Sequence, residues 1–364
     1  MKKLNAVGCN VFAGGFTVGV RKHFDVLAHL EHDSYGAEVV RRNLPGVQLY
    51  SDRKTWPQPD FFRRHDVKFV YANPPCAPFS VAAGARAARV SWDQDPRLER
   101  THDAVGLLAH RPEVLASESV VAGWTKGEAM WREKWRSARG VGYSLTVLLH
   151  DAQYLGVPQR RARVFFVFHR VALVVPEPEW GRVTTVREAR RGLKVRAVER
   201  NRWSVKSQHG ALLAEARPGE TLFRAYERLY KKPKLGDRGQ RVGSPGFLTK
   251  RVPIDAPSCV ILGAGKMHHP TEPRLLYPSE AQRLVTFPDN WQWPERCSRN
   301  SAMDLMSRGV APKVGEWIAR AARLSIEGGE RVRAPRMAVL DYRRPPGTFQ
   351  VVEGPGAGPA ETLS

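Results

Sequence analysis

The first half of the chain alternates short apolar runs with amphipathic stretches, and this alternation constrains the fold more than any other feature. Runs with the length and residue types of buried strands occupy residues 4–12, 26–30, 67–71, 114–116, 145–149 and 164–168. Residues 34–43 and 102–109 have helical spacing, and Asp33 or Ser34 can cap the first of these helices. Strands that alternate with helices predict an α/β fold with a doubly wound, mostly parallel sheet.

Ligands in such folds bind at the carboxyl ends of the strands, and several polar or glycine-rich positions fall there. The first strand runs into a turn made of Phe12, Ala13, Gly14 and Gly15. Adjacent glycines let the backbone approach a ligand closely, although an ordinary glycine turn has the same sequence. Glu31 ends the second strand, where a carboxylate can accept both hydroxyls of a ribose. Asp52 follows the next apolar segment and can accept an adenine amino group, so the set outlines an adenosine pocket.

Cys76 lies on a turn that prolines stiffen, directly after the apolar run 67–71. Pro74 and Pro75 fix φ on the N-terminal side of the thiol, and Pro78 restricts the residue that precedes it. A turn of this kind can hold a nucleophile in place. A small buried cysteine beside a turn is the structural alternative, and a short motif does not separate the two.

An acid and two cations also fall at strand ends. Glu118 closes the apolar strand that contains residues 114–116, and we expect it to face the same cleft as Cys76. Arg161 and Arg163 stand two residues apart at the entrance of the strand 164–168, so their side chains should point to the same face. A solvated acid and a solvated charge run are the simpler interpretations of each feature alone.

Composition narrows the class of protein. The 364 residues are enough for two domains, and 58 Lys and Arg against 36 Asp and Glu give a formal net charge of +22, which favours nucleic acid as the partner. We find no apolar run long enough to span a membrane and no signal peptide, so we expect a cytoplasmic protein. The four cysteines show neither CxxC spacing nor a dense framework, so we expect no metal site and no disulfide scaffold.

A basic segment with a different character separates two stretches that carry the motifs. Residues 182–251 contain 19 Lys or Arg and 6 Asp or Glu, and the alternation of strands and helices disappears there. Cations and aromatic residues are mixed around Trp203, Tyr226 and Tyr230, as in surfaces that track phosphates. We therefore expect this segment to contact nucleic acid.

The ordered set of motifs resembles the DNA cytosine-5 methyltransferases. The resemblance covers about residues 5–168 and 274–319, and it includes the turn 12–15, the Pro74-Pro75-Cys76 motif and the Gln159-Arg160-Arg161 motif. Near the C-terminus, Glu280, Arg283 and the Phe287-Pro288-Asp289 motif look like the family's ninth block, and residues 310–318 look like its last helix. The resemblance implies a class I methyltransferase fold with a smaller, basic target recognition domain.

The resemblance also assigns roles. Cys76 would add to C6 of a flipped cytosine, Glu118 would hydrogen-bond or protonate N3, and Arg163 would hold O2. Arg161 would organise the same pocket or bind a phosphate, and the loop 80–97 would close over the DNA. S-adenosylmethionine would donate the methyl group, bound by Phe12, Ala13, Gly14, Gly15, Glu31, Asp52, Pro74, Arg308 and Val310. The expected partner is double-stranded DNA, and we expect a monomer in a prokaryotic or virus-infected cell.

The same resemblance divides the chain into four parts. Residues 1–170 would form the catalytic and cofactor-binding domain, and residues 171–270 the target recognition domain. Residues 271–330 would return to the catalytic domain. The remaining segment, 331–364, is expected to be a tail without chemistry, whose prolines and glycines are typical of disorder.

Departures from the family pattern cluster in a few places. Asn10 replaces an acid, the glycine loop is shorter by about two residues, Ser119 replaces an asparagine, and Ser307-Arg308 replaces Gly-Asn. A cation at Arg308 could pair with an extra carboxylate, so a carboxymethyltransferase that uses carboxy-S-adenosylmethionine is one alternative. A catalytically inactive DNA-binding relative is another, although retention of Cys76, Glu118 and Arg163 together argues against it. An RNA methyltransferase with the same fold is the least favoured alternative.

Overall fold

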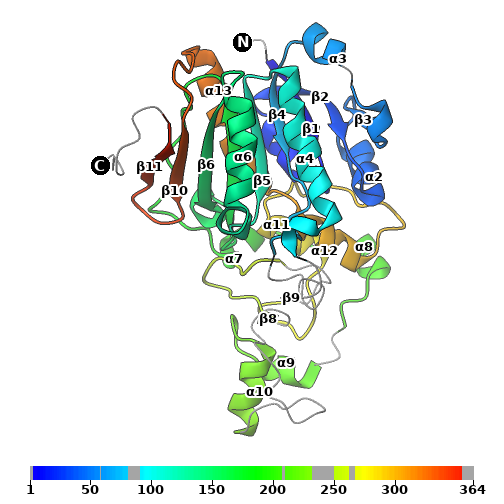
Figure 1. Cartoon of the computed structure of the whole chain (residues 1–364). Helices are drawn as coiled ribbons and strands as arrows, with labels where there is room; N and C mark the ends of the chain where they lie inside the picture. The colour runs from blue at the N-terminus through cyan, green and yellow to red at the C-terminus, as the bar shows by residue number, and fades with distance from the viewer. Residues whose placement is uncertain are drawn as a thin grey trace.

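A nine-stranded sheet forms the centre of the computed structural model, which describes residues 3–57, 59–80, 91–206, 210–231, 250–261 and 267–354. The strands lie in the order β11-β10-β6-β7-β5-β4-β1-β2-β3 (Figure 1). Their bounds are β1 Leu4–Cys9, β2 Phe24–Leu30, β3 Gln48–Tyr50, β4 Val67–Ala72, β5 Val114–Ser119, β6 Ser144–Asp151, β7 Ala162–His169, β10 Met337–Tyr342 and β11 Thr348–Glu353.

The directions of the strands decide which residues meet. β1 pairs in parallel with β2 and β4, and β4 pairs in parallel with β5. β7 is antiparallel to both β5 and β6, so β6 runs in the same direction as β5. The prediction of a doubly wound, mostly parallel sheet is confirmed. One edge of the sheet therefore collects the ends of β1, β2, β4, β5 and β6 together with the start of β7.

Helices cover both faces of this sheet, and they include nearly all of the regular structure outside it (Figure 1). The α-helices are α1 Gly15–Val20, α2 Ser34–Asn43, α3 Pro59–Arg64, α4 Glu99–Gly106, α5 Ala122–Thr125, α6 Glu128–Arg139, α7 Val186–Arg190, α8 Ala197–Arg202, α9 Gly210–Glu215, α10 Leu222–Tyr230, α11 Pro278–Leu284, α12 Arg299–Arg308 and α13 Pro312–Gly328. Short 3-10 helices are η1 Arg53–Thr55, η3 Trp92–Gln94, η4 Pro96–Leu98, η5 Leu107–His110 and η6 Ala152–Leu155.

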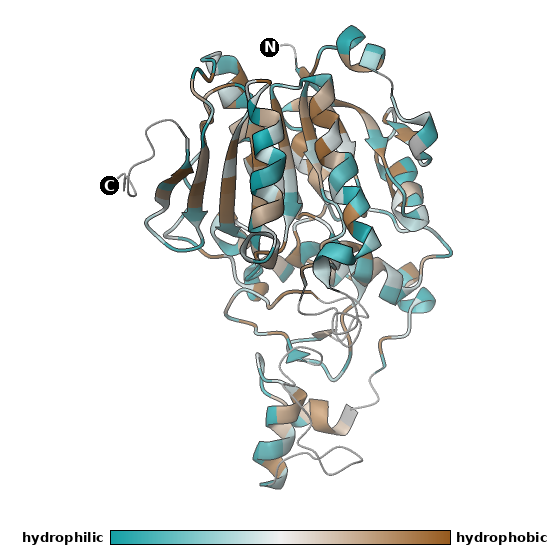
Figure 2. Ribbon diagram, in the orientation of Figure 1, coloured by the Kyte–Doolittle hydropathy of each residue, from teal (hydrophilic) through white to brown (hydrophobic). Residues whose placement is uncertain are grey.

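Two apolar cores lie on the two faces of the sheet. One contains Phe16 of α1 and Trp317 of α13, and the other contains Trp131 and Trp135 of α6 together with Ala104 of α4. Figure 2 shows apolar strands behind helices whose outer faces are hydrophilic. Burial of large apolar side chains on both faces explains why the strands read as continuous apolar runs in the sequence.

Two predicted elements differ from the structure at their ends. The first strand was expected over 4–12 but stops at Cys9, because Asn10 and Phe12 adopt φ values of 54° and 47° that extended strands do not use. The helix expected over 102–109 is α4 followed by η5. The helix expected over 34–43 has those bounds, and Asp33 caps it by accepting a hydrogen bond from the Gly36 amide at 2.9 Å.

A smaller group of helices and strands lies beyond the edge of the sheet where the strands end (Figure 1). It contains α9, α10 and the two-stranded sheet of β8 Lys250–Arg251 and β9 Met267–His268. Leu213, Ala216, Leu222 and Ala225 form its own small core. The buried Arg251 guanidinium donates to the carbonyls of Leu213 at 2.7 Å and Pro270 at 2.9 Å, which ties α9 to the chain that returns toward the sheet.

The prediction of a disordered tail over 331–364 is wrong for β10 and β11. β10 pairs in parallel with β6, and β11 pairs antiparallel with β10. The prolines that suggested disorder, Pro345 and Pro346, lie in the turn between the two strands, where they do not interrupt the ladder. Residues 355–364 lie outside the described residues.

Within the described ranges, the helices are too short or too polar to cross a membrane.

A buried cluster of three polar side chains joins α1, β2 and β4 beneath the predicted adenosine pocket. The Thr17 hydroxyl lies 2.8 Å from His29 Nε2 and 2.8 Å from the Tyr71 hydroxyl, and the latter two atoms lie 3.0 Å apart. Burial lowers the pKa of His29 to about 3, so its ring is neutral at physiological pH. Because these groups are buried away from water, their mutual hydrogen bonds hold the three elements in register.

We expect Tyr71→Phe to lower the free energy of unfolding by about 1 kcal/mol. The Phe ring would keep the aromatic contact with Phe16, while the hydroxyl that bridges Thr17 and His29 would be lost. Urea unfolding followed by circular dichroism measures the change. Tyr230→Phe, at an exposed position of α10, is the control. Equal unfolding midpoints for the two variants would contradict the role of the cluster.

Candidate functional site

The four predicted catalytic residues lie at one edge of the sheet, on neighbouring strands. Cys76 is in the turn after β4, Glu118 is in β5, and Arg161 and Arg163 stand at the start of β7. The turn is closed by the Phe79 amide, which donates to the Cys76 carbonyl at 3.1 Å. Because β7 runs opposite to β5, its first residues arrive where the other strands end. All four residues therefore lie where β4 and β5 end and β7 begins.

Glu118 is buried and held from two sides. Asn73 Nδ2 donates to Glu118 Oε2 at 2.8 Å, and Arg163 Nε lies 3.3 Å from Oε1. Burial raises the pKa of Glu118, against the opposing effect of Arg163 and Arg161. The carboxyl therefore keeps a proton to higher pH than a glutamate in water does. A carboxylic acid at this position can donate a hydrogen bond to a ligand nitrogen.

The Cys76 thiol is only partly exposed, and its surroundings tune its reactivity. Burial raises the pKa of Cys76, and the nearby Glu118 carboxylate raises it further. Arg163 and Arg161 act in the opposite direction and lower the pKa of Cys76. The arginines thus favour the thiolate, which is the nucleophilic form of cysteine.

Arg161 is a positioning residue rather than an exposed cation. Its Nη2 donates to the carbonyls of Ser307 at 2.8 Å and Gly309 at 3.1 Å, and its backbone amide donates to Asp151 Oδ1 at 2.9 Å. Burial lowers the pKa of Arg161 to about 9. Arg161 therefore joins the start of β7 to the end of α12, while its Nη1 has no hydrogen-bond partner among the described residues.

The predicted cofactor turn is folded around a buried carboxylate. Glu31 Oε2 accepts the Phe12 amide at 2.8 Å, and Oε1 accepts the Asp33 amide at 2.8 Å. Burial raises the pKa of Glu31 to about 7. Gly14 has a φ of 79°, which a residue with a side chain rarely adopts, so glycine is needed for this turn.

Two other predicted cofactor residues pack against the same region. A Cβ on Gly15 would lie 2.3 Å from the carbonyl oxygen of Val310, so the glycine permits the close approach of the chain after α12. Pro74 is buried directly after Asn73, whose amide donates to the Cys9 carbonyl at 3.0 Å. Contacts between segments far apart in the sequence thus bring the turn 12–15 next to the chain after α12, and the end of β1 next to the residue after β4.

Arg308 also lies beside the turn. Its guanidinium carbon is 4.8 Å from the centre of the Phe12 ring. Arg308 Nη2 lies 3.2 Å from Asp33 Oδ2 and 2.8 Å from Asp304 Oδ2. The cation that departs from the family pattern is therefore at the predicted cofactor pocket, and two carboxylates balance it.

Asp52, another predicted cofactor residue, makes a local contact. It is exposed, and its Oδ1 accepts the Lys54 amide at 2.9 Å, so it caps η1. It does stand near the end of β3, which adjoins Glu31 through the hydrogen bond from the Glu31 amide to the Tyr50 carbonyl at 2.9 Å. No hydrogen bond within the described ranges links the Asp52 carboxylate to the turn 12–15.

Sequence reasoning missed Asn73 and gave Asp33 only a capping role. Asn73 holds Glu118, and its Oδ1 is buried without a partner in the described part of the chain. Its place directly after β4 at the carboxyl edge was the available signal. Residues 81–90 of the predicted closing loop lie outside the described residues, as do 207–209 and 232–249 of the basic segment.

Residues 10–323 match the model of the family described as C-5 cytosine-specific DNA methylase. The chain belongs to this family. The match includes Cys76, Glu118, Arg161, Arg163 and Arg308, and it ends before β10. The family assignment made from the order of the motifs is confirmed.

Two curated relatives are type II methyltransferases. M1.HphI of Haemophilus parahaemolyticus is 26% identical to this DNA methylase over 329 residues, which are 85% of this chain and 84% of that protein. M.BbvI of Brevibacillus brevis is 30% identical over 166 residues, which are 43% of each chain.

Solved structures share the fold at low sequence identity. The methyltransferase EhMeth of Entamoeba histolytica has a TM-score of 0.63 and 12% identity, and it covers 90% of this chain and 99% of its own. A mutant of Spodoptera frugiperda DNMT2 has a TM-score of 0.57 and 14% identity, with coverages of 88% and 99%. These likenesses confirm the methyltransferase fold of the sheet.

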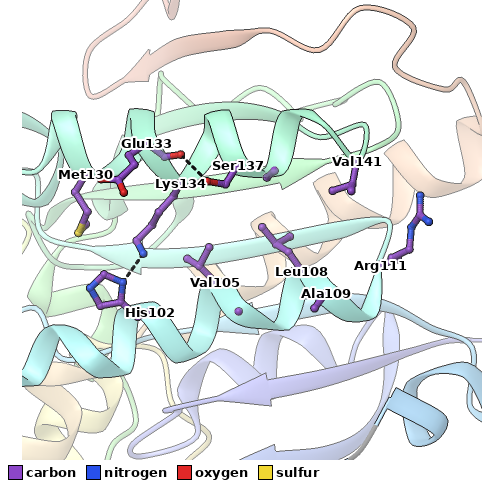
Figure 3. A pocket seen from close by; sticks show the side chains of 12 residues that line it. His102, Val105, Leu108, Ala109, Arg111, Met130, Glu133, Lys134, Ser137 and Val141 are labelled. Carbon is purple, nitrogen blue, oxygen red and sulfur yellow. Dashed lines mark hydrogen bonds between the residues drawn. The ribbon is translucent and has the colours of Figure 1, made fainter.

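A separate cavity of about 490 Å³ lies between α4 with η5 and α6 in this DNA methylase (Figure 3). Val105 and Leu108 line one side and Met130 the other, and Lys134 Nζ contacts His102 Nδ1 at 2.6 Å across the gap. It lies within the outer helix layer, and none of the predicted catalytic or cofactor residues lines it. We therefore assign the site to the edge of the sheet.

The pKa of Cys76 predicts how the thiol reacts in the free protein. Because the pKa is raised, the thiolate is scarce at pH 7, and the rate of alkylation by iodoacetamide should rise about tenfold per pH unit until the pKa is reached. Arg163→Ala should move this profile to higher pH, since Arg163 lowers the pKa of the thiol. Mass spectrometry of the Cys76 peptide measures the rate.

Arg160→Ala is the matched control, because Arg160 is exposed beside Arg161 and does not affect the pKa of Cys76. The fully buried Cys9 should remain unmodified throughout. A rate that is flat between pH 7 and 9, or a profile that Arg163→Ala leaves in place, would contradict this account of the thiol.

Proposed function

We propose that this DNA methylase transfers a methyl group from S-adenosylmethionine to C5 of a cytosine held outside the duplex, through a covalent bond between Cys76 and C6. The observation that carries the proposal is the convergence of a thiol, a protonatable buried carboxyl and a guanidinium on three neighbouring strand ends. Each group matches one requirement of cytosine chemistry.

The residues of the predicted cofactor pocket fit a nucleoside. Each Glu31 oxygen accepts one backbone amide, which leaves further lone pairs for the two hydroxyls of a ribose. Phe12, whose amide donates to Glu31, supplies apolar surface beside this carboxylate, and the Val310 carbonyl packs against Gly15 of the turn. When bound, S-adenosylmethionine supplies an electrophilic methyl group.

The first chemical step belongs to Cys76 and Glu118. The thiolate forms a bond from sulfur to C6, the C5–C6 double bond shifts to C4–C5, and the electrons of the N3–C4 double bond move to N3. Glu118 transfers its proton to N3, so no separated charge remains on the ring. C5 becomes nucleophilic as a result. The raised pKa of Glu118 keeps this proton on the carboxyl to a higher pH than in a glutamate exposed to water.

The last step restores the aromatic ring. After C5 has gained the methyl group, the N3–C4 double bond re-forms and N3 returns its proton to the Glu118 carboxylate. A water molecule acting as base then removes the C5 proton. The electrons of that C–H bond re-form the C5–C6 double bond, and the bond between sulfur and C6 breaks, which releases Cys76 as a thiolate. Arg163 would hold O2 of the base throughout, from its position beside Glu118. A base inside a duplex cannot reach the Cys76 turn, so the cytosine must be flipped out.

The charge of the chain supports double-stranded DNA as the substrate. The net charge of +22 favours a polyanion, and the basic segment 182–251 leads into the smaller part of the molecule that faces the catalytic edge. We take about residues 171–270 as the target recognition domain.

One observation bears on the carboxymethyl alternative. Arg308 does lie beside Phe12, where an anionic group on the cofactor could reach it. Asp33 and Asp304 already pair with this cation, and they would also repel a second carboxylate. We therefore favour the ordinary methyl donor.

The product identifies the reaction. We expect purified protein incubated with duplex DNA of varied sequence and S-adenosylmethionine to yield 5-methylcytosine, detected by mass spectrometry of the nucleosides. Parallel reactions with RNA, and with carboxy-S-adenosylmethionine, should yield little product. Modified cytosine in RNA alone would favour the RNA alternative, and absence of product from every combination would leave the inactive DNA-binding relative.

The covalent step has its own test. Duplex DNA that contains 5-fluorocytosine should trap the protein in an adduct that survives denaturing electrophoresis, because fluorine at C5 cannot leave as a proton does. Cys76→Ala should abolish the adduct, whereas Cys297→Ala, a buried cysteine in another part of the chain, should retain it. An adduct that persists in Cys76→Ala would remove Cys76 from this role.

Arg308 provides a test of the transferred group. If Arg308 only forms ion pairs with Asp33 and Asp304, both the natural protein and Arg308→Asn should produce 5-methylcytosine. Neither protein should produce carboxymethylcytosine. Nucleoside mass spectrometry after reaction with an equal mixture of the two cofactors gives the ratio of products. Carboxymethylcytosine from the natural protein that disappears in Arg308→Asn would overturn the choice of methyl donor.

A further inference from the structure

The turn between β10 and β11, residues 343–347, lies at the catalytic edge of the sheet. β10 pairs in parallel with β6, with Asp341 opposite Leu149 and Tyr342 opposite His150, so the two strands end together. The start of β7, where Arg161 and Arg163 lie, adjoins the end of β6. Figure 1 shows the turn on the side of the sheet that faces α9 and α10. The family match ends at residue 323, so this turn is an addition to the matched region.

Arg343 gives the turn a fixed shape. Its backbone amide donates to Asp341 Oδ1 at 3.0 Å, and its guanidinium makes a fork with the same carboxylate, with Nε 2.9 Å from Oδ1 and Nη2 2.5 Å from Oδ2. A cation held by several bonds to one acid contributes rigidity rather than a free charge.

Arg344 is the second cation of the turn, and its charge helps to lower the pKa of Asp341. It is exposed, and the described ranges show no hydrogen bond or ion pair for its guanidinium. Arg344 and Arg343 line a hollow of about 610 Å³ that reaches Ala162 and Asp151 at the ends of β7 and β6. Asp151 is already engaged, since Oδ1 accepts the Arg161 amide at 2.9 Å and Oδ2 accepts Gln153 Nε2 at 3.1 Å.

The spacing between neighbouring strands gives the distance from the β10–β11 turn to the strand that leads to Cys76. Four strand intervals separate β4, which leads to Cys76, from β10, in the order β4-β5-β7-β6-β10. Neighbouring strands lie about 4.8 Å apart, so the turn is roughly 20 Å along the edge from the Cys76 strand.

We propose that the β10–β11 turn is an accessory DNA contact, in which Arg344 binds a backbone phosphate roughly 20 Å along the sheet edge from the Cys76 strand. Arg343 and Asp341 hold the turn in place for this contact. The inference rests on the proposed DNA substrate, and it assigns a binding role to a segment that lies outside the family match.

Salt-dependent DNA binding tests the proposal. A fluorescent duplex of about 30 base pairs is titrated with the full chain at several salt concentrations. Arg344→Ala should weaken binding roughly two- to fivefold. It should also reduce the slope of log K against log salt by about one, because one phosphate contact is lost. Arg344→Glu should weaken binding further.

Arg333→Ala is the matched control. Arg333 is also exposed, but it precedes β10 and therefore lies at the opposite edge of the sheet. It should leave the salt slope unchanged. Equal effects of Arg344→Ala and Arg333→Ala, or no effect of either, would overturn the proposal.

The outcome is independent of the chemistry at Cys76. A selective loss of binding in Arg344→Ala supports the contact even if no methylated product is found. Conversely, a protein that methylates DNA and binds it equally well with Arg344→Ala retains the proposed function and loses this inference. Thermal unfolding of each variant checks that the exposed substitutions leave the fold intact.

Discussion

The antiparallel placement of β7 between β5 and β6 is the constraint on which the site depends. In a wholly parallel sheet, every strand ends at the catalytic edge, and the chain leaves that edge only through loops. β7 instead starts at that edge, so Arg163 reaches Glu118 from a rigid neighbouring strand. The thiol, the acid and the cation are then separated by single strand intervals. Their geometry follows from backbone pairing rather than from the conformation of a long loop.

A second constraint comes from the segment that returns after the smaller part of the molecule. The missing side chain of Gly15 lets the Val310 carbonyl pack against it, and the Arg161 guanidinium donates to the carbonyls of Ser307 and Gly309. The turn 12–15, the start of β7 and the end of α12 therefore share contacts around one short stretch of chain. Arg308 lies within that stretch, which explains why a change at this position concerns the cofactor pocket.

Much of this arrangement could be predicted from the sequence, because apolar runs and a helix cap are local signals. The strands that bear Cys76 and Glu118, and the helix capped by Asp33, required only patterns within a few residues. The early end of β1 at Cys9 depends on positive φ at Asn10 and Phe12, which residue types do not specify. The partners of Arg308 depend on contacts between distant segments. β10 and β11 were missed because Pro345 and Pro346 resemble the composition of a flexible tail, although they occupy only the turn.

Because the chain is synthesised from its N-terminus, the late position of β10 and β11 affects how the sheet folds. β6 is made within the first 151 residues, but its outer edge gains a partner only when β10 emerges almost 190 residues later. Until then, an apolar strand of eight residues presents unpaired backbone groups to other chains. Folding of this protein during translation thus includes a long interval in which the edge of its central sheet is open to association with other strands, and the last strands of the sheet end that interval.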